Sequence, residues 1–264
     1  MKTVTFDYRL SISFSQPVTD HRFVVCSFPQ SDERQEILDI NRMIKPNEFL
    51  SEGRDSFGNK YVYGNAREEH TQFCVNVSGT ALTGMSYRVK ADERCRLGAF
   101  AQPSGHTRGG ELVYSLFKSG EIDKISGNLE KSRRIMKIAH DSIEYCPGST
   151  NVDTCAEEAL RIRKGVCQDY AHIMLSLCRM ARIPCRYVVG MLIGEGASHA
   201  WVEVYDGGYW YGLDPTNMTE VSDSHVKISH GREYNDCRLN RGVFRGNALQ
   251  SQEVSVKVEE LYSL

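Results

Sequence analysis

A strict alternation of apolar and polar side chains opens the chain. Apolar residues occupy every second position from Val4 to Phe14. A β-strand directs successive side chains to opposite faces, so this period of two predicts a strand that is buried on one face. Shorter stretches with the character of strands follow at HRFVVCSFP, EILDINRMI, KYVYGN and TQFCVNVSG, with turn sequences such as QSDE and SFGN between them. We therefore expect residues 1–92 to form an antiparallel β-rich domain.

Helical patterns replace this alternation in the second half of the chain. We predict a helix that begins at Asn128, as its N-cap, and ends near Tyr145. The apolar residues at heptad spacing in this helix are Leu129, Met136 and Ile143. Thr154 and Glu157 have the spacing of a capping box, in which each side chain satisfies a backbone N–H at the start of a helix. This spacing predicts a second, short helix that ends near residue 163.

The helix that begins at Cys167 is apolar on most of its sides, so it is predicted to be the buried centre of the second half. It should end at Ile183-Pro184, because the residue before a proline avoids the helical conformation. Strand-like stretches then follow at CRYVVGMLI, HAWVEVY and YWYGLDP, with DGG as a turn between the last two. Residues 93–264 are therefore expected to form a domain of one buried helix and an antiparallel sheet. The fold class of the whole chain is α+β.

The composition removes several classes of function. The formal net charge is −2 and no run of basic residues is interleaved with aromatics, so we expect no nucleic-acid partner. No apolar stretch approaches the roughly 20 residues of a membrane span, and we expect no membrane association. The alternating N-terminus does not resemble a signal peptide. Nine cysteines, an odd number without a Cys-x-x-Cys pair, disfavour both a disulfide framework and a four-cysteine zinc site. A cytoplasmic protein without metal or organic cofactor is expected.

Cys167 differs from the other cysteines in its position at the first turn of a predicted helix. Most cysteines in a chain like this are small buried hydrophobes, and that is the ordinary interpretation of this one as well. The first turn of a helix, however, carries unpaired N–H groups and the positive end of the helix dipole. Both favour a thiolate, the form in which cysteine is a nucleophile. Cys167 is therefore a candidate nucleophile.

A nucleophilic thiol needs a base, and the base needs a group that orients it. If Asp206 and Gly207 form a two-residue turn, counting outward along the two strands places His199 directly opposite Asp214, on the same face. A three-residue turn at DGG would shift this register, so both registers stay open. A histidine beside an aspartate is an oriented base. The spacing does not show whether the helix carries Cys167 to the same face.

Three blocks of sequence resemble a known family. GVCQDYAH, SHAWVEVY and LDPTN, in this order and spacing, resemble the transglutaminase-like superfamily of papain-type cysteine enzymes. More specifically, the chain is similar to bacterial transglutaminase-like cysteine proteases. Its strand-rich first half, with SFSQPV and DSFGN, resembles the amino-terminal region of those proteins, and GVFRGNALQSQEVSVKV resembles their closing segment. The resemblance implies a papain-like catalytic core behind an N-terminal β-domain.

The resemblance also assigns roles to individual residues. It implies that Cys167 is the nucleophile, His199 the general base and Asp214 the carboxylate that orients the base. Asp169 matches an aspartate of the family's core motif, and we interpret it as a cap of the helix start. Papain-type enzymes often have a glutamine shortly before the cysteine as an oxyanion donor, but the six residues before Cys167 contain none. The backbone N–H of Cys167 and a second donor, for which Tyr145 is a candidate, must then form the oxyanion hole.

These residues predict a cysteine-dependent hydrolase that acts on peptide or carboxamide bonds through a thioester acyl-enzyme. Its partner would be a peptide or protein substrate. Two alternatives stay open. A protein-glutamine acyltransferase would use the same triad, and its amine channel could be walled by Trp201, Trp210 and Tyr211. A binding module that has kept the fold without the activity is the second alternative.

The remaining histidines and tryptophans have simpler interpretations. We expect His172 to be a packed or surface histidine rather than a ligand. His225 and His230 are five residues apart in what we interpret as an irregular tail, and no metal role is predicted for them. Trp201 and Trp210 are expected to be core or groove-wall aromatics.

Overall fold

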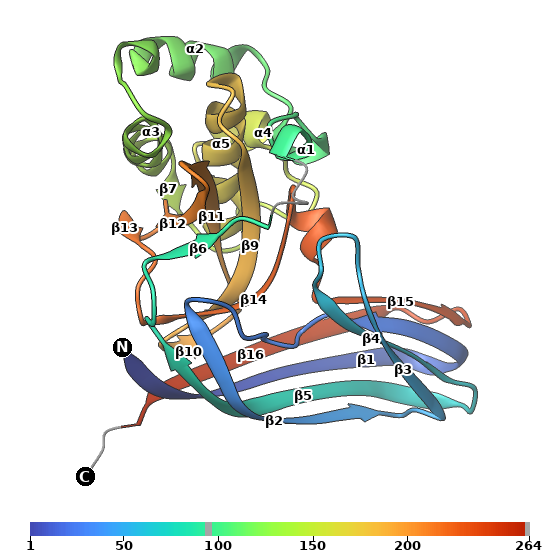
Figure 1. Ribbon diagram of the computed structural model, residues 1–264. Helices are drawn as coiled ribbons and strands as arrows, with labels where there is room; N and C mark the ends of the chain where they lie inside the picture. Colours follow the sequence, from blue (N-terminus) through green and yellow to red (C-terminus); the bar gives the residue numbers. More distant parts are fainter. Residues whose placement is uncertain (93–96, 262–264) are drawn as a thin grey trace.

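The first strand organises the larger of two antiparallel sheets (Figure 1). The computed structural model describes residues 1–92 and 97–261, and β1 (Lys2–Val25) runs through the middle of the larger sheet. The apolar side chains from Val4 to Phe14 are at most 6% exposed, which confirms the strand predicted from their alternation. The other strands of this sheet are β2 (Gln35–Lys45), β3 (Phe49–Arg54), β4 (Lys60–Ala66), β5 (His70–Thr83), β10 (Gly194–Gly196), β15 (Asn240–Arg245) and β16 (Gln250–Glu260).

The smaller sheet lies between the larger sheet and the helices (Figure 1). Its central strands follow the order β12–β11–β9–β14, and every pairing is antiparallel. The strands of this sheet are β6 (Arg88–Lys90), β9 (Cys185–Leu192), β11 (His199–Asp206), β12 (Tyr209–Asp214), β13 (Thr219–Glu220) and β14 (His225–Gly231). A third, parallel pair consists of β7 (Glu144–Tyr145) and β8 (Lys164–Gly165).

Helix α5 (Cys167–Met180) is the centre of the helical layer. All of its residues from Asp169 to Arg179 are buried, and the helix packs against β9 and β11, as its apolar pattern predicts. The other helices are α1 (Leu97–Phe100), α2 (Glu111–Ser119), α3 (Asn128–Ser142) and α4 (Ala156–Ile162), with short 3₁₀ turns at Gly105–Thr107, Ile122–Lys124 and Tyr234–Cys237. Two sheets and a helical layer make the fold α+β, as predicted. None of the helices within residues 1–92 and 97–261 combines the length and the apolar character of a membrane span.

The two sheets do not follow the predicted division of the chain at residues 92 and 93. Strand β16, from the end of the chain, pairs with β1 over eleven consecutive positions. In the opposite direction, β6 from the first part joins the smaller sheet beside β12. The division itself falls at the start of residues 93–96, which lie outside the described residues, and it stays a prediction. Each sheet is thus completed by strands from both parts of the sequence.

Two predicted helix caps were wrong. Gly127, not Asn128, is the N-cap of α3, and the Asn128 side chain instead donates a hydrogen bond to the Tyr205 carbonyl at 3.3 Å. This helix ends at Ser142, because residues 144 and 145 pair with β8. Glu157 does not complete a capping box with Thr154. Its carboxylate accepts hydrogen bonds from the backbone N–H groups of Gly110, Leu112 and Val113, and so it caps α2.

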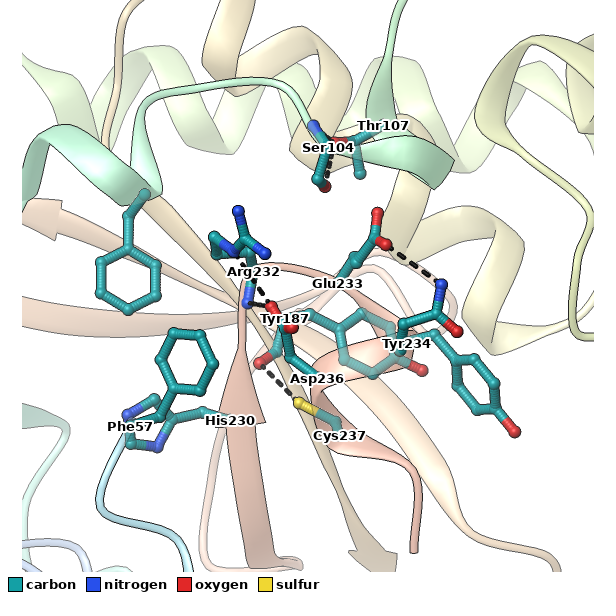
Figure 2. A network of polar contacts seen from close by, with 12 residues as sticks. Phe57, Ser104, Thr107, Tyr187, His230, Arg232, Glu233, Tyr234, Asp236 and Cys237 are labelled. Carbon is teal, nitrogen blue, oxygen red and sulfur yellow. Dashed lines mark hydrogen bonds and ion pairs between the residues drawn. The ribbon is translucent and has the colours of Figure 1, made fainter. Parts of the chain in front are cut away.

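A polar network ties α5 to the loops around it, and Figure 2 shows members of this network from those loops, among them Ser104 and Glu233. The buried guanidinium of Arg179 donates to the Ser104 hydroxyl at 3.1 Å and to the Arg232 carbonyl at 2.5 Å. Glu233 accepts a hydrogen bond from the His106 backbone at 2.8 Å. Burial would raise the pKa of Glu233, but hydrogen bonds from Ser104 and His106 outweigh it and lower that pKa to about 2. These contacts hold the helix against the loop before α2.

Candidate active site

The start of α5 is held by a buried carboxylate. Asp169 is 1% exposed, and its Oδ2 accepts hydrogen bonds from the Val166 N–H and the Thr150 hydroxyl, both at 2.7 Å. This confirms the interpretation of Asp169 as a cap, since Val166 is the N-cap of the helix. A Cβ atom on residue 165 would lie 2.7 Å from the Asp169 side chain. Gly165 is therefore required for the carboxylate to reach the turn.

Cys167 is the first residue of α5, and its side chain lies beside the start of β11. Its Sγ is 4.0 Å from the Ser198 carbonyl oxygen, and its side chain is partly exposed. The thiol also raises the pKa of the neighbouring His199, so the two side chains are close enough to interact. The tertiary structure thus brings the cysteine to the histidine, which the sequence spacing did not determine.

His199 is held between Cys167 and Asp214. Its Nε2 lies 2.7 Å from Asp214 Oδ2, which leaves Nδ1 as the ring nitrogen for the thiol. Burial lowers the pKa of His199, but hydrogen bonds to Asp214 and Cys167 outweigh it and raise that pKa to about 10. Burial raises the pKa of Asp214, but its hydrogen bonds from His199 and His225 outweigh it and hold the pKa well below the usual range. The pair is therefore an imidazolium beside a carboxylate.

The hairpin register that predicted this contact was wrong by two positions. The structure pairs Asp206 with Tyr209 and Val202 with Leu213, so Gly207 and Gly208 form the turn. Extending this register places Asp214 opposite Trp201 rather than His199. Because side chains alternate with a period of two, a shift of two positions keeps Asp214 on the face of His199. A diagonal neighbour is within reach of a long side chain, and the predicted contact forms.

The turn after β12 fixes the Asp214 carboxylate. Oδ1 accepts hydrogen bonds from the backbone N–H groups of Thr216 at 2.9 Å and Asn217 at 3.2 Å. The Asn217 side chain donates to Oδ2 at 2.8 Å. Asp214 is fully buried, so these bonds replace the water that the charge has lost. The LDPTN block therefore supplies the carboxylate and the turn that orients it.

His225 is a member of the cluster that sequence reasoning missed. It lies on β14, not in an irregular tail, and its Nε2 is 3.4 Å from Asp214 Oδ2. The alternation of Val226 and Ile228 with polar residues could have identified this strand. Among the described residues, His199, Asp214 and His225 form the one group of three potential metal ligands whose atoms all lie within 4.8 Å of one another. A metal bound there would have to replace the hydrogen bond between His199 and Asp214.

The other predicted residues lie in different environments. His172 is fully buried beside His106, as a packed histidine, and burial lowers its pKa to about 3. Trp201 and Trp210 are core aromatics, each 1% exposed. Tyr145 is more than half exposed, and its pKa is raised by burial and by the charge of Cys167. Its hydroxyl is therefore in the electrostatic range of the thiol.

Comparisons with known proteins match both halves of the sequence. Residues 118–215 match the family model of the transglutaminase-like superfamily, and residues 4–81 match that of the bacterial transglutaminase-like N-terminal region. An uncharacterised protein of Mycobacterium leprae is 32% identical over 267 residues, which cover 88% of this chain and 90% of that protein. An uncharacterised Mycobacterium tuberculosis protein is 33% identical over 147 residues, 49% of this chain and 47% of that protein.

A solved structure is similar over the whole length. The "putative cysteine protease" of Cytophaga hutchinsonii has a TM-score of 0.80 and 26% sequence identity, and the match covers 100% of this chain and 92% of that one. Both halves of the sequence thus match models of transglutaminase-like proteins, and the fold is that of the Cytophaga hutchinsonii protein. The chain belongs to the transglutaminase-like superfamily.

Proposed function

We propose that the protein is a cysteine-dependent hydrolase of peptide or carboxamide bonds, with Cys167, His199 and Asp214 as its catalytic residues. The observation that carries this proposal is the position of His199. Its ring is hydrogen-bonded to Asp214 at 2.7 Å, and Cys167 acts on the same imidazole and raises its pKa. Cysteine hydrolases need this order of nucleophile, proton carrier and orienting carboxylate.

The reaction would proceed in two steps. The thiolate of Cys167 attacks the carbonyl carbon, and the C–N bond breaks as the His199 imidazolium gives its proton to the departing amine. The product is a thioester. His199, now neutral, takes a proton from water, the hydroxide oxygen attacks the thioester, and a carboxylic acid leaves as the thiolate is restored. We assign the backbone N–H of Cys167 and the hydroxyl of Tyr145 to the oxyanion hole.

The environment of the tryptophans favours hydrolysis over acyl transfer. A transglutaminase must admit an amine and exclude water, which requires an apolar channel to the sulfur. Trp201 and Trp210, the candidate walls of such a channel, are each 1% exposed, and Trp210 faces a cavity that Cys167 does not line. We propose peptides or proteins as substrates. The cytoplasm is the proposed location, supported by the eight described cysteines, which are all free.

Product partitioning tests the choice between the two reactions. On an active amide substrate with a millimolar primary amine present, we expect mainly the free acid, because water has open access to the thioester. Mass spectrometry of the products with and without the amine measures the ratio. Predominant formation of the new amide would assign the protein to the acyltransferases and leave the roles of Cys167, His199 and Asp214 in place.

The proposed mechanism predicts where activity is lost at alkaline pH. The amine can leave only while His199 is protonated, and the pKa of this group is raised to about 10. The value of kcat/KM should therefore stay high through pH 8–9 and fall as the pH rises through about 10. The loss occurs at high pH because the fold stabilises the protonated form of His199 and so raises its pKa. A fall centred near pH 6.5, the ordinary value for histidine, would show that the imidazolium is not held by its neighbours.

A further inference from the structure

A cavity of about 860 Å³ lies between the loops of the larger sheet and the smaller sheet. Its wall includes the loop between β3 and β4, the end of α1, and side chains of β9, β12 and β14. None of Cys167, His199 and Asp214 lines it. The volume is within the range of roughly 300–1,000 Å³ that is typical of small-molecule sites. The cavity is therefore separate from the proposed active site and large enough for a ligand of its own.

One wall of the cavity is aromatic. The rings of Phe57 and Phe100 have centroids 5.9 Å apart, and the centroids of Phe100 and Trp210 are 5.4 Å apart. All three residues line the cavity. Figure 2 shows the Phe57 ring in the same region as His230, which lines the cavity as well. Phe57 is partly exposed, whereas Phe100 and Trp210 are buried behind it, at 6% and 1% exposure. The Phe57 ring is therefore the flat apolar surface that this wall offers to a ligand.

Arg186 adds a positive charge to the cavity wall. Its guanidinium carbon lies 4.3 Å from the centroid of the Trp210 ring, and its Nε donates to Glu203 at 2.6 Å. No described residue forms a hydrogen bond with its two terminal nitrogens, although the side chain is only 8% exposed. An arginine whose two terminal guanidinium nitrogens have no partner is suited to bind a carboxylate or phosphate. The free nitrogens of Arg186 are therefore candidate donors to an anion in the cavity.

Positive charge is in excess around Glu203. This fully buried carboxylate is the shared partner of Arg186, of Lys227 at 2.8 Å and of Arg34 at 3.9 Å. The Nε and Nη1 atoms of Arg34 are buried without a hydrogen bond. The Asp32 carboxylate also acts on Arg34 and Lys227. Two carboxylates among three cations leave one positive charge that an incoming anion would compensate.

The acidic residues of the cavity wall are engaged elsewhere. Asp32 Oδ1 accepts hydrogen bonds from the backbone N–H groups of Arg34 and Gln35. Both oxygens of Asp55 are bonded to its own turn, through the backbone of Phe57 and through Asn59. These carboxylates shape the loops that frame the cavity. Asp92 lines the cavity too, at the end of the first described segment.

We propose that this cavity binds an organic anion that carries a flat aromatic group. Its carboxylate or phosphate would be held by Arg186, Lys227 and His230, and its ring would pack against Phe57, which Phe100 and Trp210 support from behind. Burial lowers the pKa of His230, so its ring is neutral and contributes one N–H donor to the anion. This proposal does not depend on the proposed hydrolase activity, since the two sites share no residue.

Phenyl phosphate is the probe that combines the two features. Isothermal titration of the full chain should show saturable binding of phenyl phosphate and weaker binding of phenol and of inorganic phosphate, because each control lacks one feature. The chain has two tryptophans, so Trp210 is the only one left in a Trp201→Phe variant. Its fluorescence should change with phenyl phosphate at the concentration that titration gives. No saturable binding of phenyl phosphate would overturn the proposal.

Variants locate the binding. Arg186→Gln should weaken phenyl phosphate binding by about tenfold or more, since it removes a charged hydrogen-bond donor. Arg88→Gln is the matched control, because Arg88 lies on β6 of the same sheet and outside the cavity wall. If circular dichroism shows that Arg186→Gln is unfolded, Phe57→Ala decides: it should weaken phenyl phosphate but not inorganic phosphate. Equal affinities in the folded variant and its control would contradict the assignment.

Discussion

Iodoacetamide is expected to modify Cys167 faster than any other cysteine of the chain near neutral pH, by more than about tenfold. The thiol lies at the start of α5, is partly exposed and interacts with the His199 imidazolium. Cys178 is the internal comparison. It is fully buried in the same helix, and burial raises its pKa well above the ordinary value. Both accessibility and charge therefore increase the reaction rate of Cys167, and both decrease that of Cys178.

Peptide mapping after a short exposure to the reagent measures both rates in one sample. Cys167→Ser should keep the fold and lose hydrolytic activity by about 10³-fold or more, because a neutral hydroxyl is a poor nucleophile without stronger activation. Cys178→Ser serves as the control for the loss of a thiol. Cys167 labelled no faster than Cys178 would favour the non-catalytic binding module. A Cys167→Ser protein that retains its activity would show that Cys167 is not the nucleophile.

Asp214→Asn is expected to lower kcat by about 10²–10⁴-fold while the protein still folds. The carboxylate holds His199 in one orientation and stabilises its protonated form through the 2.7 Å hydrogen bond. An amide keeps the shape but not the charge. The pKa of His199 should fall in the variant, so the alkaline limit of activity should move to lower pH. A variant with a purely structural defect would lose activity without this movement.

The free energy of unfolding provides the accompanying measurement. The amide can still accept hydrogen bonds from the turn through its oxygen, and we expect a loss of about 1–3 kcal/mol from the bonds that remain unmade. Asp206→Asn is the control, because Asp206 stands at the turn of the same hairpin, away from His199. Near-full activity of Asp214→Asn, with an unchanged pH profile, would show that another group orients the imidazole.

Patterns among residues close in sequence predicted the strand β1 and the helix α5. The alternation from Val4 to Phe14 predicted the buried face of β1, and the apolar character after Cys167 predicted a buried helix. The helix caps were less predictable. Glu157 has the spacing of a capping box, yet its carboxylate binds the start of α2. A side chain near a helix start binds whichever unpaired N–H groups the tertiary structure brings to it.

The contact between His199 and Asp214 shows how a wrong register can give a correct pair. The predicted and observed turns differ by two residues in register, and a strand repeats its facing every two residues. The face of Asp214 was therefore determined by the parity of the spacing. Its exact neighbour was not, since that depends on which residues of Asp206–Gly207–Gly208 form the turn.

The sequence by itself determined the residue types of the site, the helix that begins at Cys167, and the face on which His199 and Asp214 meet. These follow from periodicities and caps, which depend on residues a few positions apart. Only the tertiary structure decided that Cys167 reaches His199 and that His225 contacts Asp214 at 3.4 Å. It also decided that β16 pairs with β1 and that a basic, aromatic cavity lies between the sheets. Such contacts join segments distant in the chain, and they are selected by the packing of whole elements rather than by local spacing.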